Sequence, residues 1–247
     1  MLSVSGLTKK FEDLTVMEGF DLTVPRGGFT TLIGPSGCGK STFFDVLTGV
    51  FPRDDGRISW LGEDVPDLMR RAAYMQQKDL LLPWLSLIDN AILPARIAGT
   101  DKKETLEKAS GLFRRLGLQD FEHYMPRKVS GGMRQRCALV RTLMFDHELV
   151  LLDEPLSSLD AITRSGLQNL LLLLQSEFNK TILMITHDIE EALLLSDELL
   201  VLTPMPMRIR ERFELKTPKR GRSRDPELLG IKDHVLEELE GDTDETL

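Results

Sequence analysis

Apolar residues along this chain form short runs that alternate with longer helical stripes. Buried strands of a parallel sheet have such short aliphatic and β-branched runs, which occur here at 29–33, 149–152, 181–186 and 199–202. Amphipathic helical patterns accompany them at 41–48, 161–178 and 189–195. Strands that alternate with helices predict an α/β fold with a mainly parallel sheet covered on both faces.

Two stretches depart from this alternation. Short β patterns at 2–5, 22–24 and 56–62 predict an N-terminal antiparallel β region ahead of the main sheet. From about 80 to 145 the pattern becomes helical, with an amphipathic stretch at 102–116 and a second helix at 131–144. The pattern therefore predicts an α/β core interrupted by an inserted helical subdomain.

The alternation fades after residue 215. Residues 216–224 are basic and contain Pro and Gly, as linkers do. Residues 226–240 carry one amphipathic helical pattern, for which Asp225 and Pro226 suit the cap and the first position. Residues 241–247 are acidic. We expect one domain at 1–215 and a short C-terminal extension at 216–247, with one helix and an acidic tail.

Composition narrows the class of protein. The chain has 247 residues, of which 41% are hydrophobic and 28% charged, as in ordinary soluble proteins. Its apolar runs are much shorter than the roughly 18 residues of a membrane span, and its N-terminus has no secretory-signal pattern. The formal net charge of −8 argues against nucleic acid as the main partner. We expect Cys38 and Cys137 to be reduced thiols.

Residues 34–41 read G-x-x-x-x-G-K-S, the phosphate-binding loop pattern. Glycines let backbone N–H groups point into one concavity, and the helix that follows directs its positive end there. Lys40 can reach the β- and γ-phosphates, and the Ser41 hydroxyl suits Mg²⁺. An ordinary glycine turn is the alternative, but the strand before and the helix after the loop disfavour it. The predicted phosphate-binding residues are Gly34, Pro35, Ser36, Gly37, Cys38, Gly39, Lys40, Ser41 and Thr42.

Two further strand ends carry candidate chemistry. The strand at 149–152 runs into Asp153 and Glu154, and the carboxyl edge of a parallel sheet is where ligands bind. We expect Asp153 to hold Mg²⁺, directly or through a water, and Glu154 to polarise the attacking water. His187 follows the strand at 181–186 and could reach the γ-phosphate. The alternatives are two solvated acids and a capping or core histidine.

Val129-Ser130-Gly131-Gly132-Met133 resembles the signature of ABC-type ATPases, usually Leu-Ser-Gly-Gly-Gln. The resemblance covers about residues 1–215 and implies a P-loop NTPase core with ATP and Mg²⁺ as cofactors. It also implies roles for three other residues and one loop. Phe11 would stack on adenine, Gln77 would contact Mg²⁺ and the attacking water, Ser158-Leu159-Asp160 would cross a dimer interface, and His187 would be the switch histidine.

The same resemblance implies a second copy of the chain as partner. Ser130, Gly131 and Gly132 would bind the ATP held by the other copy's phosphate loop, in a head-to-tail dimer with two equivalent sites. Val129 and Met133 depart from the family's Leu and Gln, and Met133 could alter the contact to ribose. Gln76 precedes Gln77, and the register of the following residues favours Gln77.

Leu80-Leu81-Leu82-Pro83-Trp84, after Gln77, resembles a pattern in importers of nitrate, sulfonates, taurine and pyrimidine precursors of thiamine. It implies an ATPase subunit at the cytoplasmic face of the inner membrane, with a permease docked near 80–84. An external solute-binding protein, periplasmic or extracellular, would supply the solute. The alternatives are a soluble ABC ATPase without a permease, as in cluster assembly, and a regulator that binds ATP without hydrolysis. All four solutes remain open.

Overall fold

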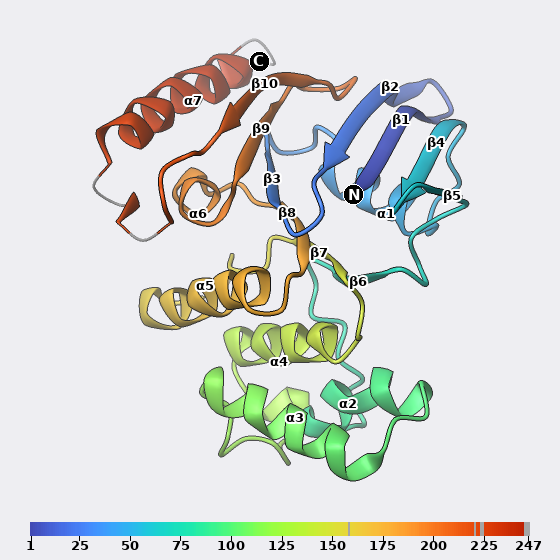
Figure 1. The fold of residues 1–247 in the computed structure, drawn as a ribbon, viewed down its shortest axis with the longest axis vertical. Helices are drawn as coiled ribbons and strands as arrows, with labels where there is room; N and C mark the ends of the chain where they lie inside the picture. The colour runs from blue at the N-terminus through green and yellow to red at the C-terminus, as the bar shows by residue number, and fades with distance from the viewer. Residues whose placement is uncertain (158, 220, 223–224, 245–247) are drawn as a thin grey trace.

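The computed structural model describes residues 1–157, 159–219, 221–222 and 225–244. Its centre is a six-stranded sheet in the order β10-β9-β3-β8-β7-β6 (Figure 1). The strands are β3 (Phe29–Ile33), β6 (Ala72–Met75), β7 (Leu149–Asp153), β8 (Thr181–Ile185), β9 (Glu198–Leu202) and β10 (Ile209–Glu214). All pair in parallel except β10, which runs antiparallel to β9. The predicted parallel sheet is confirmed.

A second, four-stranded antiparallel sheet in the order β2-β1-β4-β5 confirms the predicted N-terminal β region. Its strands are β1 (Leu2–Phe11), β2 (Leu14–Val24), β4 (Asp55–Trp60) and β5 (Glu63–Val65). Helix α1 (Lys40–Leu47) packs with both sheets, because its fully buried Phe43 and Phe44 share one core cluster with residues from each. The sandwiching of α1 fixes the start of this helix, where the phosphate-binding loop ends.

The other face of the central sheet carries helices. Side chains of β7 alternate: Leu149 and Leu151 face the core around α1, whereas Val150 and Leu152 face the opposite cluster. Helix α5 (Ala161–Ser176) packs into that opposite cluster, and α6 (Ile189–Leu195) packs beside it on β3 and β9. Burial on both faces explains why these strands read as continuous apolar runs in the sequence.

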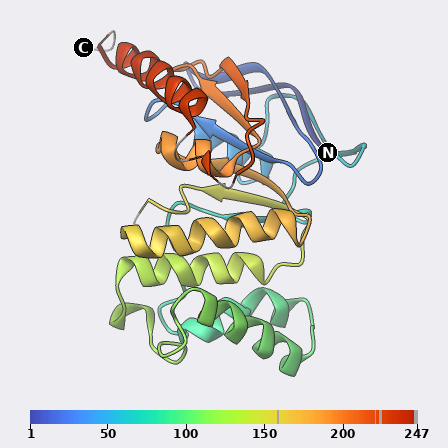
Figure 2. The same cartoon turned by 60° about the vertical axis from the view of Figure 1, so that its left-hand side comes forward.

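The predicted helical subdomain lies beyond α5, at the end of the molecule away from the N-terminal sheet (Figures 1 and 2). It contains α2 (Leu87–Ile97), α3 (Lys102–Arg115), a short 3-10 helix η1 (Pro126–Lys128) and α4 (Gly131–Leu143). Helix α4 lies alongside α5 (Figure 2), and both contribute to one apolar cluster with β7 and β8. The subdomain is thereby packed onto the sheet that carries Asp153 and Glu154.

The C-terminal segment continues from β10 into α7 (Pro226–Asp244), which lies beside α6 and β10 (Figure 1). The predicted helix at 226–240 is confirmed and extends to Asp244. Leu228 and Val235 of α7 are buried in a cluster with residues of α6 and β9. Of the predicted acidic tail, 245–247 lie outside the described residues. None of the helices in the described ranges combines the length and apolar character that a membrane crossing requires.

Candidate nucleotide-binding site

The phosphate-binding loop joins the end of β3 to the start of α1. Gly37 and Gly39 have φ angles of 79° and 108°, in the left-handed region that favours glycine. A Cβ on Gly39 would lie 2.5 Å from Cγ1 of Val16 in β2, so this position has no room for a side chain. Glycine at 39 therefore serves both the curvature of the loop and the close approach of the N-terminal sheet.

Lys40 lies at the first position of α1 and is 8% exposed. Its Nζ donates hydrogen bonds to the carbonyl oxygens of Gly34 and Pro35, both at 2.8 Å. The Sγ of Cys38 lies 3.7 Å from the same Nζ. The ammonium is thus held inside the curve of the loop by neutral acceptors, where a phosphate oxygen could compete for it.

A cavity of about 370 Å³ opens in front of this loop. Its walls come from the N-terminal sheet, the phosphate-binding loop and the carboxyl ends of the central strands. Phe11 is 37% exposed at one end and contacts Phe51 edge-to-face, with ring centroids 5.2 Å apart. The lining residues are Phe11, Leu14, Val16, Ser36, Gly37, Gly39, Lys40, Ser41, Thr42, Gln77, Glu154, His187 and Met205.

Asp153 ends β7 and is only 2% exposed. Burial raises the pKa of this carboxyl to about 6, and the charges of Glu154 and Asp45 add to the effect, while a hydrogen bond to Ser41 and the charge of Lys40 oppose it. Its Oδ1 atom is buried and has no hydrogen-bond partner among the described residues. A buried carboxylate oxygen without a partner, beside a serine hydroxyl, fits the hard-oxygen preference of Mg²⁺.

The other two predicted catalytic side chains, those of Gln77 and His187, both contact the Glu154 carboxylate. Gln77 Nε2 donates to its Oε2 at 3.1 Å, and His187 Nδ1 lies 3.3 Å from its Oε1. The Glu154 backbone has φ 48°, a conformation uncommon for a residue with a Cβ. Its N–H donates to Ile185 of β8, and its carbonyl accepts from Gln135 of α4. Backbone partners on two elements thus hold the carboxylate in place.

The structure leaves two predicted groups away from this cavity. Ser130 caps α4 by accepting from the Met133 N–H at 3.2 Å, and Gly131 lines a separate hollow with Gln77, Asp79 and Arg134. Asp160 caps α5 by accepting from the Thr163 N–H at 3.1 Å. Ser158, in the same predicted interface loop, lies outside the described residues. In this chain, then, neither 130–132 nor Asp160 lines the cavity in front of the phosphate-binding loop.

Three cavity residues were missed by sequence reasoning: Leu14, Val16 and Met205. Met205 could have been found, because it follows β9, whose carboxyl end adjoins that of β3. Leu14 and Val16 carried no usable signal, since their position depends on how the N-terminal sheet folds over the loop.

The 80–84 loop presents apolar side chains to solvent. Leu80 is 52% and Trp84 is 69% exposed. Fully buried Asn90 of α2 holds the loop, since its Oδ1 accepts from the Leu82 N–H at 2.7 Å and its Nδ2 donates to the Leu82 carbonyl at 3.1 Å. Arg141 of α4 donates to the Leu80 carbonyl at 2.8 Å. The loop is exposed but firmly attached to the helical subdomain.

A glycine loop at a helix start, beside an acidic strand end of a parallel sheet, defines the class: this is a P-loop nucleotide-binding protein. Comparison with known proteins narrows it further. The model of the ABC transporter family matches residues 17–157. The chain is 36% identical over 244 residues to the taurine import ATP-binding protein TauB of Escherichia coli O157:H7, covering 96% of each chain. It is 41% identical over 197 residues to TauB of Rhizobium johnstonii, covering 80% of this chain and 75% of that one.

The dimeric structure of the bacterial ABC transporter cassette MJ0796 superposes with a TM-score of 0.81 at 24% identity, covering 88% of this chain and all of that one. A post-hydrolysis state of the same cassette, bound to ADP and Pi, superposes with a TM-score of 0.80. This likeness concerns the fold. The family match and the TauB relatives show that the chain belongs to the ABC transporter family. It is an ATP-binding cassette of that family and an ATPase.

Proposed function

We propose that this chain is the ATP-hydrolysing subunit of an ABC importer and drives uptake of a small solute of the taurine or sulfonate type through a separate permease. The observation that supports ATP hydrolysis is that Gln77 and His187 both contact the carboxylate of Glu154, beside the phosphate-binding loop. The relatives named as taurine import proteins, at 36–41% identity, support the direction of transport and the solute class.

In this proposal Glu154 orients and polarises the water that attacks the γ-phosphate. Gln77 and His187 hold its two carboxylate oxygens, and His187 also faces the phosphate. Asp153, Ser41 and Gln77 would hold Mg²⁺, which would supply positive charge against the phosphate oxygens. Lys40 exchanges its two loop carbonyls for phosphate oxygens, and Phe11 offers its exposed ring to the adenine.

We further infer that two copies act together. Ser130, Gly131 and Gly132 stand at the start of α4 with backbone donors directed out of the helix, and they do not line their own chain's cavity. A head-to-tail dimer with ATP at two equivalent interfaces would give them a ligand. ATP binding then closes the dimer, and hydrolysis opens it.

The 80–84 loop is the proposed docking site for the permease. Exposed Leu80 and Trp84 form an apolar tip on a loop held by Asn90 and Arg141, and exposed apolar groups held rigidly in place suit a partner surface. The permease would place the chain at the cytoplasmic face of the inner membrane as a peripheral subunit. A solute-binding protein outside the membrane, periplasmic or extracellular, would deliver the solute.

The test is ATPase activity of the purified chain with its candidate permease in lipid, with and without the binding protein and taurine. We expect the rate to rise when all three are present. A chain that hydrolyses ATP but responds to no permease would favour a soluble ABC ATPase instead, for example one of cluster assembly. The matched control is Glu154→Gln, for which we expect no turnover and a dimer in ATP by size-exclusion chromatography. Near-normal turnover of this variant would refute the role of Glu154.

A further inference from the structure

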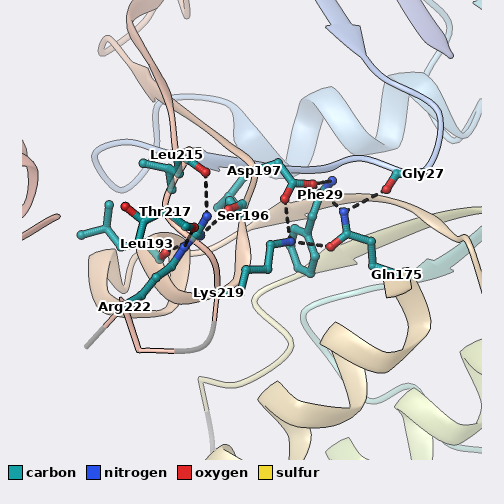
Figure 3. A network of polar contacts seen from close by, with 11 residues as sticks. Gly27, Phe29, Gln175, Leu193, Ser196, Asp197, Leu215, Thr217, Lys219 and Arg222 are labelled. Carbon is teal, nitrogen blue, oxygen red and sulfur yellow. Dashed lines mark hydrogen bonds and ion pairs between the residues drawn. The ribbon is translucent and has the colours of Figure 1, made fainter. Parts of the chain in front are cut away.

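The C-terminal segment that follows Leu215 contacts both ends of α6, the short helix that begins two residues after His187. At the far end of α6 the contact is Arg222, which is 3% exposed. Its guanidinium donates to the carbonyl oxygens of Leu193 at 2.8 Å and Ser196 at 2.5 Å, where α6 ends. It also donates to the carbonyls of Thr217 in its own segment and of Leu215 just before that segment (Figure 3). A cation at a helix C-terminus satisfies carbonyls that the helix leaves open.

A second, half-buried group, Lys219, extends this attachment to the start of β3, the strand before the phosphate-binding loop. Lys219 Nζ lies 2.9 Å from Asp197 Oδ1. Asp197 Oδ2 accepts from the Phe29 N–H at 2.9 Å, at the start of β3, and from Gln175 of α5 at 2.5 Å (Figure 3). Lys219 and Arg222 together thus join the ends of α5 and α6 and the beginning of β3.

At the near end of α6, the contact comes from α7. Lys232 Nζ lies 2.5 Å from Glu190 Oε1, in the first turn of α6. Between the two ends, Leu228 and Val235 of α7 share an apolar cluster with Ile189 and Leu193 of α6. An ion pair between Arg210 and Glu238 and a hydrogen bond between His234 and Glu211, both at 2.9 Å, hold α7 to β10.

The first turn of α6 is continuous with the catalytic strand end. Asp188, next to His187, caps the helix by accepting from the N–H groups of Glu190 and Glu191. Buried Glu191 accepts from the Thr186 hydroxyl at 3.0 Å. A helix of seven residues is only about 10 Å long and moves as one body. A shift of α6 therefore moves His187 relative to Glu154, which lies across a 3.3 Å contact.

We propose that the C-terminal segment is a positioning element for ATP hydrolysis. By holding α6 at both ends, Arg222 and Lys232 keep His187 within reach of Glu154. Neither residue lines the cavity in front of the phosphate-binding loop, so both act through α6. The inference rests on the role proposed above for His187. A segment that only stabilised the edge of the sheet would change the unfolding temperature without a specific dependence on His187.

The test is a double-mutant cycle with Lys232→Met and His187→Ala. Methionine keeps the aliphatic stem of Lys232 and removes the charge that pairs with Glu190. We expect Lys232→Met to lower kcat roughly threefold, as loss of one partly exposed ion pair allows, with KM for ATP and the unfolding temperature near those of the parent. In the His187→Ala background the same change should have no further effect on the residual rate. The matched control is Lys216→Met, which removes an exposed lysine whose one ion pair among the described residues is with Glu214 at the end of β10.

A second variant tests the pair independently of His187. Exchanging the charges, Glu190→Lys with Lys232→Glu, should recover most of the rate lost in Lys232→Met. The inference is overturned if Lys232→Met matches the Lys216→Met control, if its loss is the same with and without His187, or if the exchanged pair recovers nothing. A His187→Ala variant with the kcat of the parent would overturn the proposed role of His187 and this inference together, whereas additive losses would overturn the inference alone.

Discussion

Asp153→Asn should make the nucleotide-free protein more stable while removing the Mg²⁺-dependent ATP hydrolysis proposed above. The reason is that Asp153 is buried. Only 2% of its surface is exposed, and its Oδ1 atom has no hydrogen-bond partner among the described residues. A charge in this position is unfavourable until a cation arrives. An amide of the same shape carries no charge, so the folded variant avoids the free-energy cost of a buried charge.

The magnitude follows from the pKa of Asp153, which burial raises from 3.8 to about 6. Each pH unit of pKa change corresponds to about 1.4 kcal/mol, so ionised Asp153 destabilises the fold by about 3 kcal/mol at neutral pH. Leaving buried amide atoms imperfectly paired costs about 1 kcal/mol. The net gain in the free energy of unfolding is about 2 kcal/mol, or about 4 to 8 °C for a chain of this size.

The sign of the pH dependence follows from the same two pKa values. Above pH 6, Asp153 is ionised in both the folded and the unfolded chain, and the fold bears the full cost of the buried charge. Below pH 3.8 the carboxyl is protonated in both states, and this cost disappears. The advantage of Asp153→Asn should therefore be complete above pH 6 and should shrink as the pH falls from about 6 toward 4.

The assay is thermal unfolding in EDTA at pH 7.5 and pH 4.5, with exposed Asp64→Asn as the control variant. In Mg²⁺ and ATP the order should reverse, because only the parent gains the stabilisation of a bound ligand. The reasoning is refuted if Asp153→Asn unfolds at a lower temperature than the parent at pH 7.5 in EDTA, or if the difference grows as the pH falls.

Three other substitutions test separate parts of the site. Lys40→Ala should weaken ATP binding by more than about tenfold in a fluorescent-nucleotide titration, since it removes the only loop ammonium; unchanged affinity would contradict the phosphate-loop assignment. Asn90→Ala should lower the free energy of unfolding by about 2 kcal/mol in urea, because buried backbone groups of the 80–84 loop lose their partner; an effect no larger than that of a surface change would contradict this. Trp84→Ala should change the free energy of unfolding by less than about 0.5 kcal/mol yet reduce stimulation by the permease, and undiminished stimulation would place docking elsewhere.

Much of the fold followed from the apolar pattern. The strand at 29–33 and the helix at 189–195 were predicted to the residue, because both are bounded by turn or capping residues. The pattern gave no sign of β5, β6 or β10. β6 has only four residues, and most of β10 is partly exposed. Such strands exist through their pairing partners and leave little trace in local sequence.

The candidate site was predictable where chemistry is concentrated in consecutive residues. The glycine loop and the Asp153-Glu154 pair were evident from the chain alone. What could not be read was the contact of Gln77 and His187 with the two oxygens of one carboxylate, since the three residues are far apart in the sequence. The attachment of the C-terminal segment to α6 was also hidden, because Arg222 lies in a stretch with the composition of a linker and finds its carbonyl partners only after folding.

The clamping of the 80–84 loop has a mechanical consequence. Arg141 donates to the carbonyls of Leu80 and Asp79, and Arg134 pairs with the Asp79 carboxylate at 2.9 Å. Both arginines belong to α4, the helix that starts at Gly131. Because these contacts attach the loop to α4, a partner that displaces Trp84 would displace α4 with it. The same stiffness works in reverse: whatever draws the start of α4 toward a second copy also swings the exposed tip of the loop.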